Sequence, residues 1–482
     1  MEHSAGLLIG GEWRTAPSWS EVRSPWDSAV VGRVGRAGPE QVDAAVRAAE
    51  HGFDLVAGLP AAERARLLRR ASALVAERRE RFAAAIIAES GKPRRHAAAE
   101  VDRAVETLRL SSEEAGRLHG ETVPLDAAPG SARRRGYFIR VPLGVVGAIT
   151  PFNFPLNLVC HKVGPALAAG NSIVLKPASA TPLTALLLGQ VFIEAGLPPG
   201  ALNIVTGPGP AVGLPLVRDI RVRLITFTGS AAVGETIRTE SGLRRTALEL
   251  GANCGAIVDE TADLDAALER CLAGGFAYSG QVCIHTQRLY LHTAIADEFT
   301  RRFVERARAL ACGDPADPAT EVGPMINRAA VEAALELVRS AVEAGAELLC
   351  GGTAENNLMH PTVLARVGPE LPVVCEETFA PVVTVETFKD FDSGLAMFNR
   401  GSSAGTRDYG LACGVFTSDL NRAFRATERL AVGNVYVNDS ATFRADLAPY
   451  GGVRDSGTGR EGPRFAVEQM TDIRMVSFNL GD

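Results

Sequence analysis

Short apolar segments alternate with helical segments between residues 144 and 250, and this alternation limits the folds open to the chain more than any other feature. Four apolar segments read as strands: GVVGAIT (144–150), NSIVLKP (171–177), LNIVTG (202–207) and RLITFTG (223–229). Helical text such as PLTALLLGQVFIEAG separates them. Strands that alternate with helices form βαβ units around a parallel sheet. The sequence therefore predicts an α/β fold.

A second set of strands and helices follows residue 251, and a helical region precedes the first set. Strand-like text recurs at AIVDE (256–260), VVTVETF (382–388) and GVFTS (414–418), with a helix expected over 301–310. Between residues 40 and 118, apolar residues recur every three or four positions, which indicates amphipathic helices. At 482 residues the chain is too long for one core, so we expect two or three domains.

The composition is typical of a globular protein and argues against several kinds of partner. A net charge of -6 gives no reason to expect nucleic acid or an anionic membrane surface. No apolar run approaches the length of a membrane span, and the start MEHSAGLLIGGEW does not read as a signal peptide. The eight cysteines include no CxxC pair, which argues against a disulfide scaffold and against a metal site. We therefore predict a cytoplasmic protein without a bound metal.

Three segments at predicted strand ends are candidates for binding a phosphate or a ribose. TGPGPAVG (206–213) departs by one residue from the dinucleotide fingerprint, so a plain strand-to-helix turn is the favoured reading. FTGSAAVG (227–234) follows a strand and opens a helix, which puts Gly229 and Ser230 where a phosphate can bind. Lys176 ends another strand. There it is either a solvated charge or a group that faces the ligand crevice.

Three polar side chains occupy positions that suit covalent catalysis. Cys283 lies in GQVCIHTQR (280–288); taken alone it reads as a buried structural cysteine, because a nucleophile needs a base or a field that favours the thiolate. Glu249 of LELGAN ends an apolar strand, where a carboxylate is costly unless it is paired or functional. Asn153 of PFNFP either donates its amide to a developing oxyanion or stabilises a turn.

Seven motifs in this order resemble the aldehyde dehydrogenase superfamily, and they span nearly the whole chain. They are PFNFP, LKPASATP, FTGSAAVG, LELGAN, GQVCIHTQR, EETFAPV (376–382) and PYGGVRDSGTGRE (449–461). The resemblance is to the NAD(P)-dependent, non-acylating members. It implies that Cys283 attacks an aldehyde to give a thiohemiacetal and then a thioester. It also implies that Asn153 and the backbone N–H of Cys283 form the oxyanion hole, and that Glu249 activates the hydrolytic water.

The same resemblance implies a set of cofactor contacts, with NADP or NAD as the cofactor. Glu377 is similar to the residue that holds the nicotinamide ribose, and Phe379 would lie beside the nicotinamide ring. Lys176 resembles the ligand of the adenosine ribose, and Gly229 and Ser230 resemble the pyrophosphate contacts. Many NAD-preferring relatives carry an acid at the position of Ser179. A serine there leaves room for the 2′-phosphate of NADP.

The implied substrate is a short anionic or hydroxylated aldehyde. Three stretches look most like the branch that includes lactaldehyde and phosphonoacetaldehyde dehydrogenases: EVDRAVETLRLSSEEA, GQVCIHTQR and VNDSATFRADLAPYGG. Four side chains are implied to face the substrate tunnel: Arg103, His161, His285 and Arg444. Arginine and histidine suit a carboxylate, phosphonate or phosphate. Alternatively, the two arginines pair with Glu106 or Asp446 at the surface and bind nothing.

Two other functions remain open at this stage. A CoA-acylating relative would pass the acyl group to CoA, and Glu249 argues against it because a base for water would be harmful there. A non-catalytic protein on the same fold is the other alternative. Arg288, which ends the motif of Cys283, is expected to support that loop structurally.

The resemblance implies three parts. A Rossmann-type cofactor domain would come from residues 1–119 and 140–250, and an α/β catalytic domain from 251–448. A small β oligomerisation element would come from 120–139 and 449–482. Because an isolated strand pair is unstable, this element implies a homodimer or homotetramer.

Overall fold

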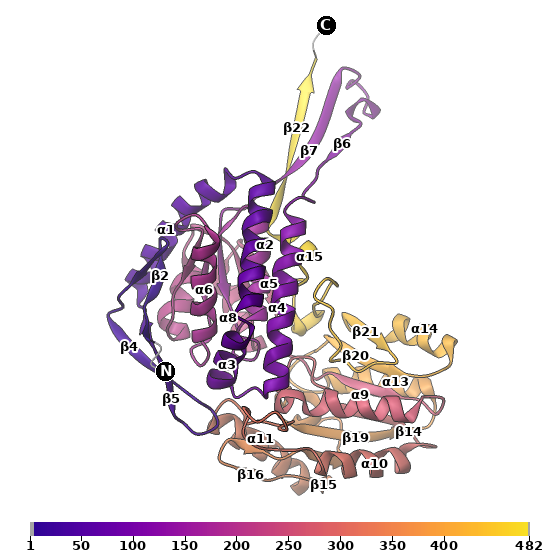
Figure 1. The fold of residues 1–482 in the computed structure, drawn as a ribbon. Coiled ribbons are helices and arrows are strands. Elements are labelled where there is room, and N and C mark those ends of the chain that lie inside the picture. The colour runs from indigo at the N-terminus through magenta and orange to yellow at the C-terminus, as the bar shows by residue number, and fades with distance from the viewer. Residues whose placement is uncertain (1–3, 481–482) are drawn as a thin grey trace.

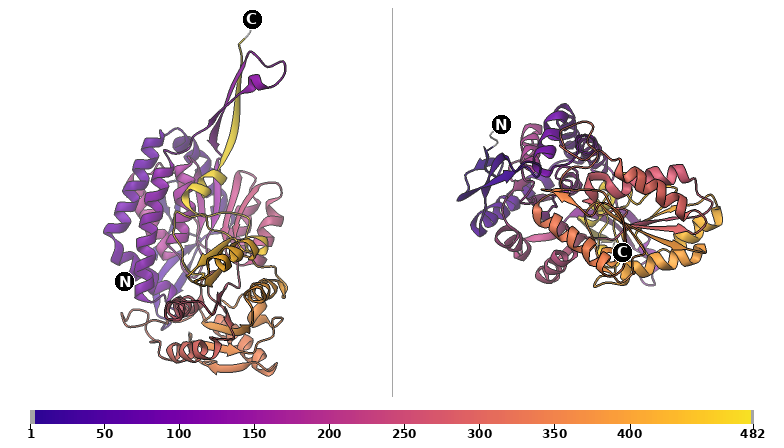
Figure 2. Two further views of the ribbon diagram at one scale, coloured as in Figure 1. Left: turned by 90° about the vertical axis from the view of Figure 1, so that its right-hand side faces the viewer. Right: turned by 90° about the horizontal axis from the view of Figure 1, so that it is seen from below.

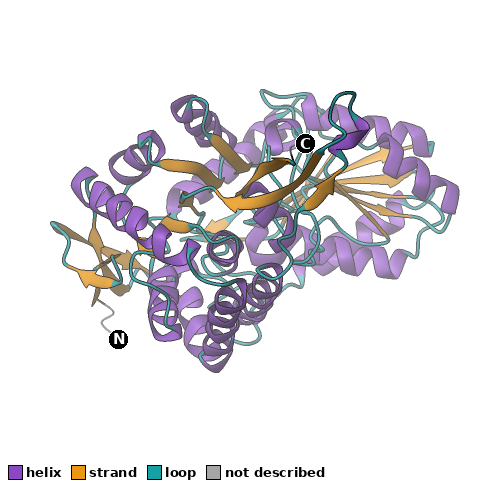
Figure 3. Ribbon diagram, turned by 90° about the horizontal axis from the view of Figure 1, so that it is seen from above, coloured by secondary structure: helices purple, strands orange, loops and turns teal. Residues whose placement is uncertain are grey.

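The computed structural model describes residues 4–480 and contains two seven-stranded sheets and three smaller ones. The large sheets form two lobes, and a narrow ribbon projects beyond the first lobe (Figure 1). Helices cover both sheets, as the view from above shows (Figure 3). The predicted α/β fold is therefore confirmed. Residues 1–3, at the start of the predicted segment 1–119, and residues 481–482, at the end of the predicted segment 449–482, lie outside the described residues.

The chain begins with short strands and four helices. The strands are β1 (Ser4–Ala5), β2 (Leu7–Ile9), β3 (Glu12–Arg14), β4 (Ser18–Arg23) and β5 (Val30–Arg36). The helices are α1 (Pro39–Ala57), α2 (Ala61–Glu77), α3 (Arg79–Ser90) and α4 (Arg94–Glu114). Strands β1, β5 and β4 form a small sheet of their own, whereas β2 and β3 join the edge of the first large sheet.

The first lobe is built on five parallel strands whose order creates a switch point. They are β8 (Val145–Ile149), β9 (Ser172–Lys176), β10 (Leu202–Ile204), β11 (Val222–Thr228) and β12 (Arg245–Glu249). The helices between them are α5 (Asn157–Ala168), α6 (Leu183–Ala195), α7 (Leu214–Arg218) and α8 (Ala231–Ser241), and η2 (Gly209–Gly213) precedes α7. The spatial order is β12, β11, β8, β9, β10. Ligands bind where such an order reverses, here at the carboxyl ends of β8 and β11.

Alternate side chains of these strands enter two different cores. In β9, Ile173 and Leu175 pack in the cluster that contains α2, α4, α5 and α6, whereas Val174 packs with α1 and α7. Such burial on both faces explains why the strand text is continuously apolar instead of alternating.

The second lobe is also mostly parallel. Its sheet runs β15 (Glu347–Cys350), β18 (Thr362–Ala365), β19 (Val382–Phe388), β14 (Arg288–His292), β13 (Gly255–Val258), β20 (Ala412–Phe416) and β21 (Asn434–Val437). Helices α9 (Leu264–Phe276) and α10 (Ala296–Arg308) pack in one core, and α13 (Phe391–Ser403) and α14 (Leu420–Arg429) in another. The remaining elements are η3 (Ala277–Gly280), α11 (Arg328–Glu343), β16 (Ala354–Glu355), β17 (Leu358–Met359) and α12 (Pro372–Cys375).

The projecting ribbon is a three-stranded antiparallel sheet, and the left view of Figure 2 shows it clear of the body. It contains β6 (Glu121–Val123), β7 (Arg134–Pro142) and β22 (Thr471–Asn479), with η1 (Leu125–Ala127) between β6 and β7. Helix α15 (Pro463–Gln469) leads into β22, and η4 (Arg454–Ser456) precedes it. Only the last part of the segment 449–482 is therefore in the ribbon. Residues 449–461 lie instead at the junction where the two lobes meet.

A buried ion pair fixes the approach of α4 to the chain that follows β8. Lys92 and Glu100 are both fully buried, and the ammonium of Lys92 contacts the Glu100 carboxylate. Oε1 of Glu100 also accepts the backbone N–H groups of Leu156 and Asn157, 2.9 and 3.1 Å away, at the start of α5. Burial lowers the pKa of Lys92 to about 8, and the charge of Glu100 opposes this shift.

We predict that Glu100→Gln destabilises the protein strongly, because it leaves the Lys92 ammonium buried without its counter-ion. Removing one partner of a buried pair typically costs about 3–5 kcal/mol. The urea midpoint of unfolding should fall accordingly. Glu80→Gln is the matched control, because Glu80 is exposed and pairs only with surface arginines. Equal midpoints for the two variants would contradict the prediction.

Candidate active site

The two large sheets face each other end to end. Strand β12 ends at Glu249 and β13 begins at Gly255, so that only residues 250–254 connect the two lobes at this point. The carboxyl ends of the parallel strands in the first lobe therefore point at the amino ends of those in the second. The first lobe presents Asn153, Lys176, Gly229 and Glu249 at this junction, each directly after or at the end of a strand.

A left-handed turn presents Cys283 to the junction. Tyr278, Ser279 and Gly280 in η3 have φ values of 49°, 56° and 69° in succession. Non-glycine residues in this region are strained and persist only where surrounding contacts hold them. A Cβ at Gly280 would lie 2.1 Å from the carbonyl oxygen of Ala380, so only glycine fits there. The strain is thus concentrated next to the predicted nucleophile.

The sulfur of Cys283 has a single side-chain hydrogen-bond partner among the described residues. Its Sγ lies 2.9 Å from Oη of Tyr450. Burial raises the pKa of the Cys283 thiol to about 11, and the Tyr450 hydrogen bond and the charge of Arg444 oppose this shift. The resting group is therefore a neutral thiol.

Cys283 and Glu249 line the same small cavity, which has a volume of about 30 Å³. Its walls include Arg103, Asn157, Glu249, Cys283, Arg444 and Tyr450. The structure thus brings together the predicted nucleophile, the predicted base and both predicted substrate arginines, from positions up to 341 residues apart (444 − 103).

Glu249 is buried without a hydrogen-bond partner for either carboxyl oxygen within residues 4–480. Burial raises its pKa well above the usual range, and the negative charge of Glu461 raises it further. The cations Lys162 and Arg444 oppose these effects only in part. A Cβ at Gly451 would lie 2.9 Å from Oε1 of Glu249, so the neighbouring loop must be glycine-rich to admit the carboxyl group. Burial therefore favours the protonated form of Glu249.

Sequence analysis missed the ion pairs that surround Glu249. Nζ of Lys162 lies 3.2 Å from Oε1 of Glu461, and Nη2 of Arg444 lies 2.6 Å from Oε2 of the same carboxylate. Although burial alone would raise it, these two cations hold the pKa of Glu461 well below its usual range. The rarity of lysine could have pointed to these positions, because only four lysines occur in the chain, at 92, 162, 176 and 389. Three of them are buried next to this junction.

Asp446 is a shared hydrogen-bond partner for several polar side chains around the cavity. It accepts hydrogen bonds from Nε and Nη2 of Arg103 at 2.9 and 2.7 Å, and from Nδ2 of Asn157 at 3.2 Å. Nε2 of His161 lies 2.8 Å from the same carboxylate. Arg103 thus pairs with Asp446, as expected if the arginines form ion pairs and bind no substrate. However, the side chain of Asp446 is only 5% exposed and that of Arg103 28%, so the pair is partly buried at the cavity wall.

The two predicted substrate histidines do not line the cavity. Burial lowers the pKa of both, so both rings are neutral. The His161 ring is occupied by Asp446, as described above. Nε2 of His285 lies 2.9 Å from the carbonyl oxygen of Gly275 in α9, because the turn that presents Cys283 directs the next side chains toward that helix. The geometry therefore does not support a substrate contact for either histidine.

Asn153 lies against the turn of Cys283. Its Nδ2 donates to the carbonyl oxygen of Gln281 over 3.0 Å, and its Oδ1 is buried with no partner within the described chain. Arg288 lies deeper, where its guanidinium donates to the carbonyl oxygens of Asn253 and Phe398. Arg288 thus ties the start of β14 to the linker between the lobes.

Two predicted cofactor residues lie at the carboxyl end of β9. The ammonium of Lys176 has one hydrogen bond, to the carbonyl oxygen of Pro177 at 3.1 Å, and burial lowers its pKa to about 8. Its stem passes Gly213, where a Cβ would come within 3.6 Å of Cδ. Ser179 is exposed and donates to the carbonyl oxygen of Gly207 over 2.9 Å. A nearly unpartnered ammonium beside an exposed hydroxyl fits a ribose or its phosphate.

The other predicted cofactor residues also fit a dinucleotide. Gly229 and Ser230 precede α8, whose first N–H groups receive no side-chain cap and so remain available to a phosphate. Oε1 of Glu377 accepts the N–H of Ala252 over 3.0 Å, and burial raises the pKa of Glu377 to about 7. The ring of Phe379 meets that of Phe152 edge-on, with 5.8 Å between centroids.

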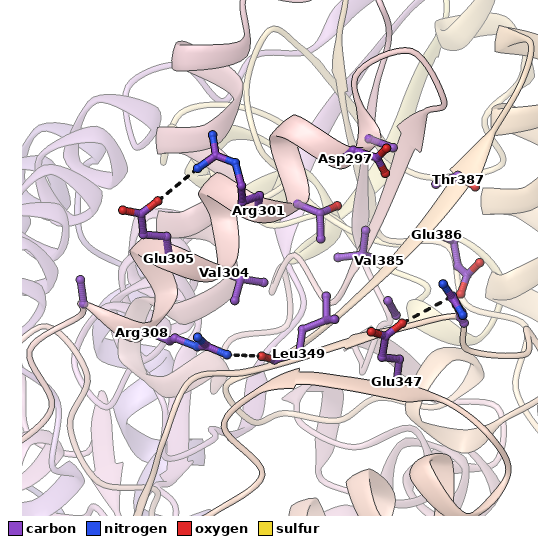
Figure 4. Close-up of a pocket in the computed structure, with 15 residues that line it drawn as sticks. Asp297, Arg301, Val304, Glu305, Arg308, Glu347, Leu349, Val385, Glu386 and Thr387 are labelled. Carbon is purple, nitrogen blue, oxygen red and sulfur yellow. Dashed lines mark hydrogen bonds and ion pairs between the residues drawn. The ribbon is translucent and has the colours of Figure 1, made fainter.

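A larger hollow of about 970 Å³ lies elsewhere, between α10 and the strands β15, β18 and β19 (Figure 4). Four of its charged side chains pair, Arg301 with Glu305 and Arg366 with Glu347, each at 3.5 Å, and Arg308 donates to the carbonyl oxygen of Leu349. None of the predicted site residues lines it. We therefore assign it no part in the site.

The described residues lack two features that would point to other functions. No group of three or more His, Cys, Asp or Glu side chains within residues 4–480 is arranged to hold a metal ion. None of the helices there combines the length and the apolar character that crossing a membrane requires.

Comparisons with known proteins agree with this arrangement. A sequence profile described as "Aldehyde dehydrogenase family" matches residues 13–476. The 3-sulfolactaldehyde dehydrogenase of Priestia megaterium is 42% identical over 475 residues, which are 98% of each chain. The structure of aldehyde dehydrogenase 21 from Physcomitrella patens, in complex with the reaction product succinate, has a TM-score of 0.96 and 36% identity, and covers 100% of this chain and 99% of that one.

A third similar protein was solved with a cofactor. It is the NADP-dependent glyceraldehyde-3-phosphate dehydrogenase from Bacillus halodurans, complexed with NADP. Its TM-score is 0.95 at 33% identity, and the match covers all of both chains.

We predict that Glu249 makes the stability of the protein depend on pH. A carboxyl group whose pKa is raised on folding contributes its stability below the ordinary glutamate value of 4.5 and loses it as the pH rises through the folded value. Urea midpoints of the wild type should therefore fall relative to those of Glu249→Gln as the pH is raised from about 4.5. Parallel midpoint curves for the two proteins would show that Glu249 has an ordinary pKa.

Proposed function

The chain belongs to the aldehyde dehydrogenase family, and on that premise we propose how its own residues oxidise an aldehyde to a carboxylic acid. It is an NAD(P)-dependent aldehyde dehydrogenase. The observation that carries the proposed mechanism is that Cys283 and Glu249, which are 34 residues apart in sequence (283 − 249), line one small cavity between the lobes. Burial raises the pKa of both groups and so favours their neutral forms, whereas each acts in its deprotonated form.

Cys283 is the nucleophile. As a thiolate it adds to the aldehyde carbonyl and forms a thiohemiacetal, whose oxygen becomes negative as the bond forms. Asn153, whose Nδ2 lies against the same turn, and the backbone N–H of Cys283 donate to this oxygen. One such donor is typically worth about 10²–10³ in turnover rate.

NADP or NAD is held along the ends of the first sheet. Lys176 and Ser179 bind the adenosine ribose or its 2′-phosphate. Gly229 and Ser230 place the N-terminal end of α8 at the pyrophosphate, while the N–H of Gly229 itself donates to the carbonyl oxygen of Glu249. Glu377 holds the nicotinamide ribose and Phe379 borders the ring. The bound dinucleotide supplies the hydride acceptor that turns the thiohemiacetal into a thioester.

Glu249 completes the reaction as a base. After losing its proton it takes one from a water molecule, and the resulting hydroxide attacks the thioester carbon. The acid leaves and the Cys283 thiolate is restored. The fixed charges of Lys162 and Arg444 next to Glu461 favour the ionised form of Glu249 and so limit the upward shift of its pKa.

The substrate is a short aldehyde with an anionic or hydroxylated tail. Three cations, Arg103, Lys162 and Arg444, surround the cavity beside the anions Asp446 and Glu461, and burial favours the uncharged form of Glu249. Nε of Arg444 is buried without a hydrogen-bond partner within residues 4–480, and the carboxylate oxygen with which it pairs, Oδ1 of Asp446, lies 3.9 Å away, which favours a substrate oxygen at that place. The names of similar proteins point to sulfonate, carboxylate and phosphate tails.

The chain assembles as a homodimer or homotetramer. The projecting ribbon exposes apolar side chains along most of its length: Tyr137, Ile139, Ile473, Met475 and Phe478, which are 38% to 60% exposed. By the strand register, Tyr137, Ile139 and Phe478 lie on one face of the ribbon and Ile473 and Met475 on the other. A small sheet with exposed apolar side chains is a typical interaction surface. We place the enzyme in the cytoplasm, where a reducing environment would preserve its eight free thiols.

The first prediction from this mechanism concerns the two reacting groups. Cys283→Ala should abolish turnover while dinucleotide binding persists, because the cofactor contacts lie on other strands. Glu249→Gln should release about one reduced cofactor per active site and then stall at the thioester. Stopped-flow absorbance of the reduced cofactor measures the turnover of Cys283→Ala and the burst of Glu249→Gln. Cys312→Ala is the matched control. Sustained turnover by Cys283→Ala, or turnover that requires added CoA, would refute the mechanism.

The second prediction concerns the cofactor. Ser179→Glu should weaken NADP by tenfold or more and NAD much less, because a carboxylate would repel the 2′-phosphate. Calorimetric titration of both dinucleotides measures the difference. Equal losses for the two cofactors would mean that Ser179 does not face this phosphate.

The third prediction concerns the substrate tail. Arg103→Leu should lower the specificity constant for anionic short aldehydes by roughly tenfold to a hundredfold and spare neutral ones of equal length. Arg109→Leu is the matched control, since Arg109 lies on the same helix and pairs at the surface with Glu106 and Glu113. A panel of aldehydes that differ only in tail charge tests this. If all members lose equally, Arg103 does not recognise the tail.

A further inference from the structure

Tyr450 has an unusual position for a residue that no step of the proposed mechanism uses. Its hydroxyl lies 2.9 Å from the sulfur of Cys283, and it has no other hydrogen-bond partner within residues 4–480. The residue is 3% exposed and lines the same cavity. The phenol therefore contacts the reacting atom directly, while Cys283 itself remains partly exposed.

The ring of Tyr450 is held on two sides. Its backbone N–H donates to the carbonyl oxygen of Glu461 over 3.1 Å, and the N–H of Glu461 donates back over 2.6 Å. The guanidinium of Arg444 lies over the face of the ring, 3.8 Å from its centroid. Since Arg444 also pairs with Glu461, the phenol, the cation and the carboxylate form one rigid unit. The hydroxyl is thereby aimed at the sulfur.

The protonation of the two groups decides which one donates. Burial raises the pKa of Tyr450 well above its ordinary value, so the phenol keeps its proton whenever Cys283 ionises. Burial also disfavours the thiolate of Cys283, and a hydrogen bond to a charged acceptor is the strong kind that can offset this. A cation on the ring face withdraws electron density from the phenol and makes it a better donor.

We propose that Tyr450 is a catalytic residue that donates its hydroxyl hydrogen bond to the thiolate of Cys283 and so sustains the nucleophile. Arg444 is a positioning residue that acts through the ring of Tyr450. The thiol proton leaves to solvent while Tyr450 keeps its own, and no covalent bond to Tyr450 forms. The proposal rests on the proposed role of Cys283 as nucleophile.

If the same hydrogen bond ran in the opposite direction, the expected change in the acidity of Cys283 would have the opposite sign. If the thiol donated to the phenol oxygen, Tyr450 would stabilise the neutral thiol, and removing its hydroxyl would make Cys283 more acidic. If Tyr450 donates to the thiolate, removing its hydroxyl makes Cys283 less acidic. The sign of the change therefore distinguishes the two arrangements.

The test is the rate at which iodoacetamide alkylates Cys283, measured against pH in the absence of aldehyde and read by mass spectrometry of the Cys283 peptide. Tyr450→Phe should raise the apparent pKa by about one to two units, which lowers the rate at neutral pH about tenfold to a hundredfold. The variant keeps the ring and its contact with Arg444. Its melting midpoint and dinucleotide binding should match the wild type.

Tyr436→Phe is the matched control. Tyr436 is a partly buried tyrosine that packs in the same cluster as Cys283, and its ring meets Phe443 edge-on, but its hydroxyl makes no hydrogen bond to Sγ. The alkylation profile of this variant should equal that of the wild type. A shift as large as that of Tyr450→Phe would overturn the proposal, because any nearby hydroxyl would then suffice.

The remaining outcomes separate this proposal from the proposed function. An unchanged or acid-shifted profile for Tyr450→Phe, with Cys283→Ala inactive, refutes the role of Tyr450 and leaves the mechanism standing. Full turnover by Cys283→Ala refutes the mechanism instead, whatever the alkylation profile. Loss of fold in Tyr450→Phe, seen as a lower melting midpoint together with lost dinucleotide binding, would make Tyr450 structural and would also refute the proposal.

Discussion

The buried pair of Lys92 and Glu100 connects the segments on which the active site depends. Glu100 holds the first N–H groups of α5, and so fixes the end of the loop that carries Asn153. The ammonium of Lys92 lies 3.7 Å from the ring centroid of Phe154 and 4.6 Å from that of Tyr278. One cation therefore touches both the oxyanion-side loop of the first lobe and the left-handed turn of the second. Buried charges are costly unless every contact is satisfied, and this requirement keeps the two loops in register.

A second group of buried charges surrounds the cavity itself. Glu461 is shared by Lys162 and Arg444, and Asp446 is shared by Arg103 and the amide of Asn157. These pairs are built from residues on both lobes, so the lobes must close correctly before any of them is satisfied. Glu249 is the exception, because neither of its oxygens has a partner among the described residues. Such an unsatisfied acid lowers stability, and its retention is understandable where a water molecule must be activated.

The two reacting groups share a resting state that suits covalent chemistry. Burial raises the pKa of both Cys283 and Glu249, which favours the uncharged thiol and carboxylic acid and so limits the repulsion of an anionic substrate that enters. Each group has a neighbour that opposes its shift: Tyr450 for the sulfur, and the cations next to Glu461 for the carboxyl group. The small cavity excludes bulk water, which strengthens these electrostatic contacts. Reactivity is thus set by the neighbours and not by the two residues alone.

Local pattern was sufficient for much of the fold and for part of the site. The apolar text of 144–150 and 171–177 became β8 and β9 within one or two residues, because burial on both faces leaves an unmistakable signature in the sequence. Strand ends follow from strand positions, and Lys176 and Glu249 were found at such ends. The strand order was not readable, since it depends on which strands pair across long connections.

What the sequence determined by itself is therefore the alternation of strands and helices and the motifs at their ends. The tertiary structure alone decided which side chains meet: Tyr450 with Cys283, Glu461 with Lys162, and Asp446 with Arg103, which are 167, 299 and 343 residues apart. It also turned His285 away from the cavity, toward α9. The physical reason is that periodicity reports which face of an element is buried. It carries no information about the partner across an interface, because that partner comes from a loop without any period.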